Sequence, residues 1–432
     1  MKKVFYLFST FLCVAFLSSC GKGAGGKVIR FLHWEDANNQ KYFEPIFAEF
    51  EKRHPGWKVV SEQATGSYIG KINALMAAET PPDIFYLQAN MAIYYASKGE
   101  LEPLNSYLEK DTEVDLNKYF EGVRNMMTWK GNVYNLPKGC HSLALYYNKD
   151  LFDQEGIPYP DDTWTYDTMA SVAKKLTKDV DKDGRMDQYG FRGFTWLDIF
   201  TLMLSYGGGI LSKEADKITV TSRETLSALQ FIYDTKYKMK ISPSAGELGM
   251  DGAGGAQVDP FLLGKIGMQI GIFATVYDLN TKAPNLNYDV APLPKGPKGR
   301  ISWLESTGFY MSSKSKNKEM AWELLKLLGG PMGQRIYAQA GRDVPAYNDP
   351  EAIKIFLDPS QKPAHREVFL KQLDNAFFQR YHIDAVLTAF GQEWDKINNE
   401  QKDPAKAMAD AYPNIRNAIN ELKSQIGEPP IN

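Results

Sequence analysis

The chain has 432 residues, of which 44% are hydrophobic and 24% are charged, and its formal net charge is −2 at pH 7. This composition is typical of a globular protein of about two or three domains with sizeable apolar cores. The balanced charge, with lysine and arginine scattered along the chain, excludes the basic surface that nucleic-acid binding requires, so we expect no nucleic-acid partner.

The N-terminal residues have the pattern of an export signal. Lys2 and Lys3 give a positive start, residues 4–16 are mostly apolar, and small residues precede Cys20. The apolar run is shorter than the roughly 18–20 residues that span a bilayer, so this order predicts a signal peptide over residues 1–19. Leu-Ser-Ser-Cys at residues 17–20 resembles a bacterial lipobox, which implies cleavage before Cys20 and its modification with diacylglycerol and an N-acyl chain. Several acyl chains anchor a protein to a membrane far more firmly than one.

Gly21, Gly23 and Gly26 match the spacing G-x-G-x-x-G of a dinucleotide-binding loop. Such a loop follows a strand and opens a helix, because the helix N-terminus binds the pyrophosphate. Here the glycines follow the predicted cleavage site and precede a predicted strand, which is the wrong order. We interpret residues 20–27 as a lipid anchor and a flexible glycine-rich tether.

Cys140 is the one cysteine that follows Cys13 and Cys20 in the sequence. A single thiol in the mature protein cannot form an internal disulfide bond, although export would permit one. A reactive nucleophile is one interpretation, and a buried, inert core residue is the one we favour.

Strands and helices alternate along the first part of the chain. Residues 28–32 predict a strand, and apolar residues at 43, 46, 47 and 50 predict an amphipathic helix that ends near Pro55. Further predicted elements are a strand at 57–61, a helix at 69–76 and a strand at 83–87. This alternation favours parallel βαβ units.

A second group of elements follows later in the chain. Residues 308–311 predict a strand and residues 321–328 a helix that ends at Gly329. Residues 363–426 are helical by pattern, and Pro404 and Pro413 predict breaks within them.

Several sequence stretches together resemble one known family. They are VIRFLHWEDANNQKYFEPIFAEF from residue 28, INALMAAETPPDIFYLQAN from residue 72, YNLPKGCHSLALYYNKDLF from residue 134, GKIGMQIGIFATVYDL from residue 264, ISWLESTGFYMSSK from residue 301, and AGRDVPAY from residue 340. In this order, behind a lipobox, they resemble the family 1 extracellular solute-binding proteins of ABC importers, which include maltodextrin-binding protein. The resemblance covers almost the whole mature chain.

The resemblance implies an α/β fold of two lobes, periplasmic-binding-protein-like, with hinge strands and a ligand cleft between the lobes. By analogy the chain crosses between lobes near residues 139–145, 303–308 and 341–346. The expected first lobe comprises residues 28–139 and 306–344, and the expected second lobe comprises residues 140–305 and the helical residues 345–432. Such proteins close around their ligand by hinge motion, and an ABC permease recognises the closed form. We expect a monomer.

A sugar site requires aromatic faces for the C–H side of the ring, and fixed donors and acceptors for its hydroxyl groups. Strand ends in the first lobe are expected to supply part of such a site, because ligands bind at the carboxyl ends of strands in α/β sheets. The candidates in this lobe and at the first crossing are Trp34, Glu35, Asp36, Tyr68, Gln88, Asn90 and His141. Alternative roles remain open: Asp36 as a helix cap, Tyr68 as a core or surface residue, and Gln88 and Asn90 as ordinary loop polarity.

The second lobe and the hinge are expected to supply the other wall. The candidates there are Trp196, Phe273, Tyr277, Trp303, Glu305 and Arg342. Phe273 occupies a position where the resembled family often has a stacking tryptophan; phenylalanine keeps the ring but lacks the N–H donor, which leaves room for a ligand other than a sugar. Trp196 has core packing as an equal alternative.

An acidic loop at residues 179–187 fits the pattern D-x-D-x-D-G. Close carboxylates repel one another unless a cation neutralises them, and the glycine permits a sharp turn. Gly190 stands where an EF-hand has its glutamate, so the motif is not a complete EF-hand. We expect a structural Ca²⁺ bound by Asp179, Asp181, Asp183, the Arg185 carbonyl and Asp187, with an exposed turn as the alternative.

The sequence therefore predicts a lipid-anchored, exported solute-binding protein, facing the periplasm or the cell exterior, that passes a mono- or oligosaccharide to an ABC permease and catalyses no reaction. Two alternatives stay open. One is a secreted glycoside hydrolase, which would use two opposed carboxylates, for example among Glu35, Asp36 and Glu305. The other is a lipoprotein receptor for a peptide or protein ligand.

Overall fold

The computed structural model describes residues 27–37, 39–243, 259–381 and 383–431. The predicted signal peptide, Cys20 and residues 21–26 of the predicted tether lie outside the described residues. Among the helices described, none has the length and apolar character that a membrane span requires.

The first lobe is built on a five-stranded sheet with the strand order β2-β1-β3-β12-β6. The strands β1, β2 and β3 are mutually parallel where they pair, whereas β12 runs antiparallel between β3 and β6. Their bounds are β1 Lys27–His33, β2 Trp57–Gln63, β3 Ile84–Gln88, β6 Asn135–His141 and β12 Glu305–Met311.

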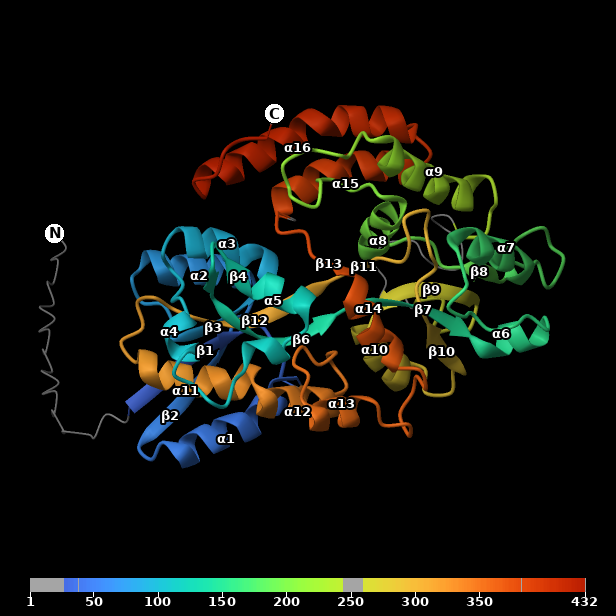
Figure 1. Ribbon diagram of the computed structural model, residues 1–432. Coiled ribbons are helices and arrows are strands. Elements are labelled where there is room, and N and C mark those ends of the chain that lie inside the picture. The colour runs from blue at the N-terminus through green and yellow to red at the C-terminus, as the bar shows by residue number, and fades with distance from the viewer. Residues whose placement is uncertain (1–26, 38, 244–258, 382, 432) are drawn as a thin grey trace, which may run out of the picture.

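Helices cover both faces of this sheet. Figure 1 shows α1 (Glu44–Arg53) and α11 (Lys318–Gly329) on one face, and α2 (Tyr68–Ala77) and α3 (Ala89–Ser97) on the other. The central strand β3 is therefore buried on both faces, as its apolar sequence IFYL requires. The predicted βαβ pattern of the first ninety residues and the later predicted strand and helix are confirmed.

The second lobe is built on a four-stranded sheet with the order β10-β7-β9-β8. The strand β7 lies between β10 and β9 and is buried along its whole length, LALYYN. The strand bounds are β7 Leu143–Asn148, β8 Tyr189–Phe191, β9 Ile266–Ile272 and β10 Tyr288–Ala291. The helices of this part are α6 Lys149–Gln154, α7 Tyr166–Leu176, α8 Trp196–Tyr206, α9 Arg223–Tyr237 and α10 Ala274–Lys282.

The chain passes between the sheets at short connections. The strand β6 ends at His141 and β7 begins at Leu143, so Ser142 alone separates the two sheets at the first connection. The return passes through β11 (Ser302–Trp303) directly into β12. The two-lobed α/β fold is therefore formed from strands that are distant in sequence; the residue boundaries assigned to each lobe stay predictions.

A third segment runs beside the first connection. The backbone N–H of Cys140 donates to the carbonyl of Val344 at 3.0 Å, and the Val344 N–H donates back at 3.2 Å. Gly139 permits this approach, because a Cβ there would lie 2.4 Å from the Cβ of Asp343. Cys140 is wholly buried, and burial raises the pKa of its thiol above the ordinary value, as expected of an inert core cysteine.

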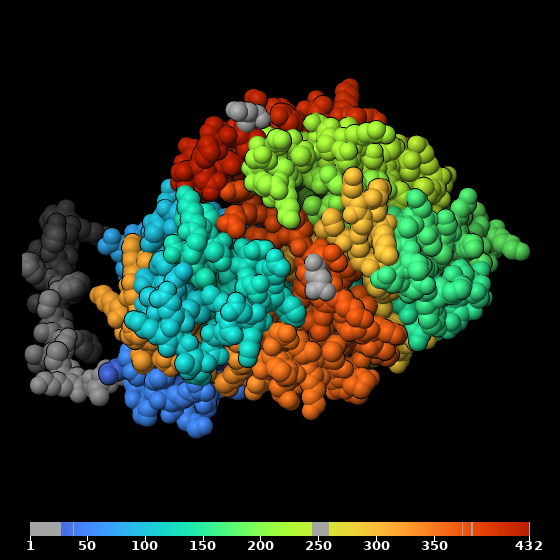
Figure 2. Space-filling view, viewed as in Figure 1, coloured from blue at the N-terminus to red at the C-terminus, as the bar shows by residue number. Residues whose placement is uncertain are grey.

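The C-terminal part of the chain contacts both lobes. Figure 1 shows α15 (Asp384–Asn398) and α16 (Pro404–Gln425) extending over the two halves, and Figure 2 shows the orange-to-red residues between and above the blue-cyan and green parts. The Lys98 ammonium of the first lobe donates to the Gln425 carbonyl at 3.3 Å, and Lys236 of α9 donates to the Asn398 carbonyl at 2.9 Å. The remaining elements here are α12 Pro331–Ala340, α13 Pro350–Phe356, α14 Glu367–Gln372, η4 Leu373–Asn375 and β13 Ala376–Phe377.

One predicted helix break is wrong. Pro404 is the first residue of α16, where a missing N–H costs nothing, but Pro413 lies inside the same continuous helix. The buried stripe of α16, which includes Met408, Ile415 and Ile419, continues on both sides of the proline. Packing of that stripe therefore outweighs the lost hydrogen bond.

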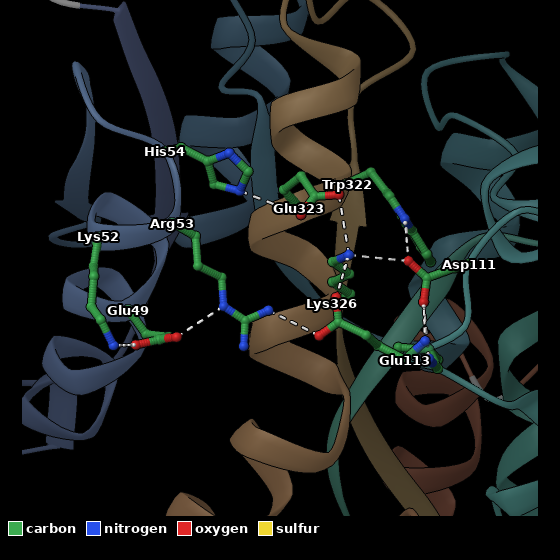
Figure 3. Close-up of polar contacts among 10 residues, drawn as sticks. Glu49, Lys52, Arg53, His54, Asp111, Glu113, Trp322, Glu323 and Lys326 are labelled. Carbon is green, nitrogen blue, oxygen red and sulfur yellow. Dashed lines mark hydrogen bonds and ion pairs between the residues drawn. The ribbon is translucent and has the colours of Figure 1, made fainter.

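A network of charged side chains joins α1, α11 and the loop before α5 (Glu121–Met127) on the first lobe (Figure 3). The ammonium of Lys326 is nearly buried and lies 3.2 Å from Asp111, 2.7 Å from Glu113 and 3.1 Å from Glu323. Burial alone would lower the pKa of Lys326, but its hydrogen bonds to these carboxylates raise it above the ordinary value. Arg53 extends the network from Glu113 to α1, so the helices on this face are held together by alternating charges.

Candidate functional site

A cavity of about 250 Å³ lies where the two lobes and the C-terminal segment meet. The strand ends of β1, β3 and β6 supply residues from the first sheet, Ile272 comes from the end of β9 in the second sheet, and β11, β12 and the residues after β13 complete the wall. This is the position where α/β sheets bind ligands, because loops follow the carboxyl ends of the strands. The lining residues are Trp34, Gln88, Ala89, Asn90, His141, Ile272, Trp303, Leu304, Glu305, Ser306, Thr307, Phe378 and Gln379.

Two tryptophans on opposite lobes form apolar walls. Trp34 is stacked on Tyr86, with ring centroids 4.2 Å apart, and meets Tyr68 edge to face at 4.8 Å. Trp303 is buried against Phe200 of α8, at a centroid distance of 5.2 Å. Both rings are thus fixed by other aromatic rings, which gives a ligand preformed flat surfaces.

Tyr68 supports this wall from behind. Its hydroxyl donates to the Leu32 carbonyl at 3.1 Å and accepts from the Tyr86 N–H at 3.0 Å. Burial raises the pKa of Tyr68 above the ordinary value. The side chain therefore joins β1 to β3 and positions Trp34, and it does not line the cavity.

A buried charge cluster lies at the hinge. Lys138 of β6 is 5% exposed and Asp343 is 3% exposed, and their Nζ and Oδ2 atoms are 2.8 Å apart. The same ammonium lies 3.4 Å from Glu35 Oε1. Burial alone would raise the pKa of the Asp343 carboxyl, but Lys138 and His141 outweigh it and hold that pKa well below its usual range. The cluster ties the loop after β1, the strand β6 and the third connecting segment to one another.

His141 and Glu305 connect this cluster to the cavity. The Nε2 atom of His141 lies 3.3 Å from Asp343 Oδ1, and Glu305 stands directly opposite His141 in the β6–β12 ladder. Burial raises the pKa of the Glu305 carboxyl, against the opposing influence of His141 and of the neighbouring Trp303 indole. Contacts between polar side chains therefore connect the buried Lys138 to the cavity wall.

The structure brings together six of the predicted ligand residues as cavity lining: Trp34, Gln88, Asn90, His141, Trp303 and Glu305. Glu35 lies behind the wall, between Lys138 and the Tyr86 hydroxyl. The Asp36 carboxylate accepts hydrogen bonds from the N–H of Asn39 at 2.9 Å and from its side-chain amide at 3.1 Å, which is the capping role left open for it.

The other predicted residues lie elsewhere. Phe273 is wholly buried between Phe356 and Phe369, at centroid distances of 4.9 and 5.2 Å, so it offers no ring face to a ligand in this structure. The Arg342 guanidinium stacks on the exposed ring of Tyr277 at 4.3 Å, and neither residue is in the cavity lining.

Trp196 is also absent from the lining. It packs edge to face on Phe200 at 5.1 Å and contacts Phe390 of α15 at 5.8 Å. This is the alternative of core packing between α8 and the C-terminal helices.

Sequence reasoning missed Gln379 and Phe378, which follow β13 and line the cavity. Gln379 is 6% exposed, and its side-chain amide forms no hydrogen bond with another described residue. It stands between this cavity and a larger groove of about 620 Å³ beside α5. No sequence signal marks it, because its place depends on β13 pairing with β11. Lys138 directly precedes the first predicted crossing and Asp343 lies within the third, and this proximity was the only sequence signal for them.

The acidic loop forms a compact turn. Oxygen atoms of Asp179, Asp181 and Asp187 lie within 4.8 Å of one another. Backbone N–H groups also use these carboxylates: Gly184 N donates to Asp179 at 2.9 Å, and Val180 N donates to Asp187 at 2.7 Å. Three of the predicted carboxylates thus fit a cation. The fourth, Asp183, is outside this set and accepts a hydrogen bond from the Arg185 N–H at 2.8 Å.

Comparison with known proteins identifies the family. The family model of the bacterial extracellular solute-binding proteins matches residues 36–335, which is more than half of the chain. The chain belongs to this family. The family resemblance drawn from the sequence stretches is confirmed, and membership of an extracellular family makes the chain an exported protein.

Individual relatives agree with this assignment. A putative binding protein of Brucella abortus is 28% identical over 393 residues, which covers 89% of this chain and 88% of the relative. The galactooligosaccharide-binding protein of Bacillus subtilis is 25% identical over 368 residues, covering 79% and 82%. The fold is similar to that of an ABC substrate-binding protein of Listeria monocytogenes in complex with cycloalternan, with a TM-score of 0.78, 24% identity and coverage of 93% and 100%.

Proposed function

We propose that the protein captures a sugar in the cavity between its lobes and delivers it, unchanged, to the permease of an ABC importer. The observation that carries this proposal is the interlobe cavity itself, which has a tryptophan from each side and hydrogen-bonding groups between them. Flat aromatic faces suit the C–H side of a sugar ring, and amide, hydroxyl and carboxylate groups suit its hydroxyl rim. The names of relatives support the ligand class: one binds galactooligosaccharides, and others are named for maltotriose and maltodextrin.

The size of the cavity bears on the ligand. Pockets that enclose drug-sized ligands have volumes of roughly 300–1,000 Å³. The present cavity, at about 250 Å³, is slightly below that range. It suits a ligand of one or two sugar rings, or the end of a longer chain.

The hydrolase alternative has weaker support. Relatives over most of the chain are named as binding proteins. Two of the three carboxylates weighed as a catalytic pair are engaged otherwise: Glu35 is held by Lys138, and Asp36 caps the turn that follows it. We therefore propose that the protein binds sugars without cleaving them.

The test is a binding screen with a variant of the cavity. We expect at least one mono- or oligosaccharide to bind in isothermal titration calorimetry and to change tryptophan fluorescence, because both Trp34 and Trp303 line the site. Gln379→Leu keeps the volume but removes the amide, so affinity for that sugar is expected to fall by about 1 kcal/mol or more, roughly fivefold. Gln425→Leu, on the exposed end of α16, is the matched control and is expected to bind normally. Release of smaller sugars from an oligosaccharide would contradict the proposal.

We also propose that Cys20 anchors the protein to a membrane. Cys20→Ala removes the sulfur that carries the lipid, so the protein is expected to stay unprocessed or to leave the membrane fraction. Membrane fractionation and the mass of the mature chain measure this result. An unchanged fraction and mass in the variant would show that another feature anchors the chain, and Cys13→Ala, within the predicted signal peptide, serves as the control.

We propose that the acidic loop binds Ca²⁺ through Asp179, Asp181 and Asp187. An ion that binds only the native state raises stability by about 2.7 kcal/mol at a concentration of 100 Kd, so a chelator is expected to lower Tm. Asp181→Ala is expected to abolish the difference between calcium and chelator. Asp216→Ala, at an exposed aspartate of another loop, is expected to leave that difference intact. A melting temperature that ignores both calcium and chelator in the unmodified protein would leave the loop as a turn.

A further inference from the structure

We infer that the cavity selects its ligand by charge: it accepts uncharged and amine-bearing sugars and rejects sugars that carry a carboxylate or a phosphate. The inference rests on the proposed sugar-binding function and specifies the class of sugar.

The first observation is an excess of carboxylates beside the cavity. Glu35 and Asp343 are both buried, and they share a single buried ammonium, that of Lys138, at 3.4 and 2.8 Å. This cation is therefore already engaged by two anions. It is not available to neutralise a third negative charge brought in by a ligand.

The second observation is a carboxylate on the cavity wall itself. Glu305 lines the cavity and forms no ion pair with a lysine or arginine of the described chain; its neighbours are His141 and the Trp303 indole. His141 in turn lies 3.3 Å from Asp343, so its Nε2 atom is already engaged by another carboxylate.

The third observation concerns the rest of the lining. Among the described lining residues the remaining polar side chains are uncharged amides and hydroxyls, those of Gln88, Asn90, Ser306, Thr307 and Gln379. Arg342, which lies in the third predicted crossing, has its guanidinium stacked on Tyr277 and does not line the cavity.

All three features disfavour a negatively charged ligand. A ligand carboxylate or phosphate would enter a partly buried site beside Glu305 and the buried cluster, where like charges repel more strongly than in bulk solvent. Hydroxyl groups can donate to Glu305 without this penalty, and an ammonium group adds a charge-assisted hydrogen bond. The site therefore discriminates by repulsion as well as by attraction.

The experiment compares sugars that differ only in charge. Calorimetric titrations of the full-length protein in detergent would use three matched sets: glucose, glucosamine and glucuronate; galactose, galactosamine and galacturonate; and mannose, mannosamine and mannuronate. In each set whose neutral sugar binds, the uronate is expected to bind at least about tenfold more weakly than the neutral sugar, and the amino sugar at least as tightly.

A variant locates the discrimination. Glu305→Gln keeps the shape and removes the charge, so the ratio between uronate and neutral sugar is expected to fall to about threefold or less. Glu421→Gln, at an exposed position of α16, is expected to keep the full ratio. Thermal unfolding of each variant checks that it is folded, and the matched sets on the unmodified protein remain decisive if Glu305→Gln does not fold.

The outcomes separate the two levels of the proposal. Uronates that bind as tightly as the neutral sugars would overturn charge selection and leave sugar binding intact. An unaltered ratio in a folded Glu305→Gln variant would overturn the role of Glu305. Absence of binding by every sugar tested, including oligosaccharides of the three neutral sugars, would overturn the proposed function and the inference with it.

Discussion

Lys138→Met is expected to destabilise the protein by about 3–5 kcal/mol at pH 7, because it leaves Asp343 and Glu35 buried without their cation. Methionine fills the volume of the lysine stem, so the effect isolates the charge rather than a cavity. Urea unfolding followed by circular dichroism measures the free energy of unfolding. The same variant is expected to weaken ligand binding, since Lys138 holds Asp343, and Asp343 in turn contacts His141 of the cavity lining.

The pH dependence of this variant gives a sharper test. The folded-state pKa of Asp343 lies below its unfolded value of about 3.9, so its contribution to stability is present above that pH and is lost as the pH falls toward the folded pKa. In the variant the lowering influence of Lys138 is absent and only that of His141 still opposes burial, so the pKa of Asp343 is higher than in the unmodified protein. Asp343 of the variant therefore takes up a proton at higher pH. The difference in the free energy of unfolding between the variant and the unmodified protein is expected to narrow below about pH 5.

Lys406→Met, at an exposed position of α16, is the matched control and is expected to change the free energy of unfolding by less than about 0.5 kcal/mol. A Lys138→Met protein of normal stability would show that water, rather than the lysine, satisfies the two carboxylates. If the variant and the unmodified protein differed in the free energy of unfolding by the same amount at pH 4 and at pH 7, the assignment of the effect to charge would be contradicted.

Trp303→Ala is expected to cost about 3–5 kcal/mol of stability, because a wholly packed ring between α8 and the C-terminal segment would be replaced by a cavity. The same change removes a wall of the ligand cavity. Sugar binding is expected to weaken by about 1–3 kcal/mol beyond any loss due to unfolding. Thermal unfolding and calorimetric titration, performed well below the Tm of the variant, separate the two effects.

Trp303→Phe distinguishes the ring from its N–H group. Phenylalanine keeps most of the packing but has no N–H donor, so a small loss of stability with a clear loss of affinity would assign the binding role to the indole N–H group of Trp303. Trp394→Ala, in α15 away from the cavity lining, is the control for a buried tryptophan and is expected to lower stability alone. Normal affinity in Trp303→Ala would exclude the ring as a ligand wall.

Local pattern predicted the elements of the first lobe well. The stretches around Phe31 and Phe85 alternate with amphipathic helices, and period and length suffice to distinguish these classes. Pro413 shows the limit of that reasoning, since a strong local helix breaker is overridden by the buried stripe of α16. The two-lobed fold itself came from resemblance to a family rather than from periodicity.

The site was predictable where it follows a strand directly. Trp34, Gln88 and His141 stand at strand ends, and the topology of an α/β sheet places such residues at one edge. Phe273 and Gln379 were not predictable, because burial of the first and the position of the second depend on the packing of α13, α14 and β13. Sequence spacing carries no information on such long-range contacts.

The antiparallel strand β12 has a consequence for the order in which the molecule can form. It pairs Gly308 with Leu87 of β3 and Glu305 with His141 of β6, so the middle of the first sheet is closed by residues synthesised more than 160 positions after β6. Until then β6 and the β12-facing edge of β3 have no partner strand in this sheet. The nascent first lobe therefore remains incomplete while almost the whole second lobe is made. Such long-range closure slows folding, because the chain must close a loop of the length of the second lobe before these contacts form.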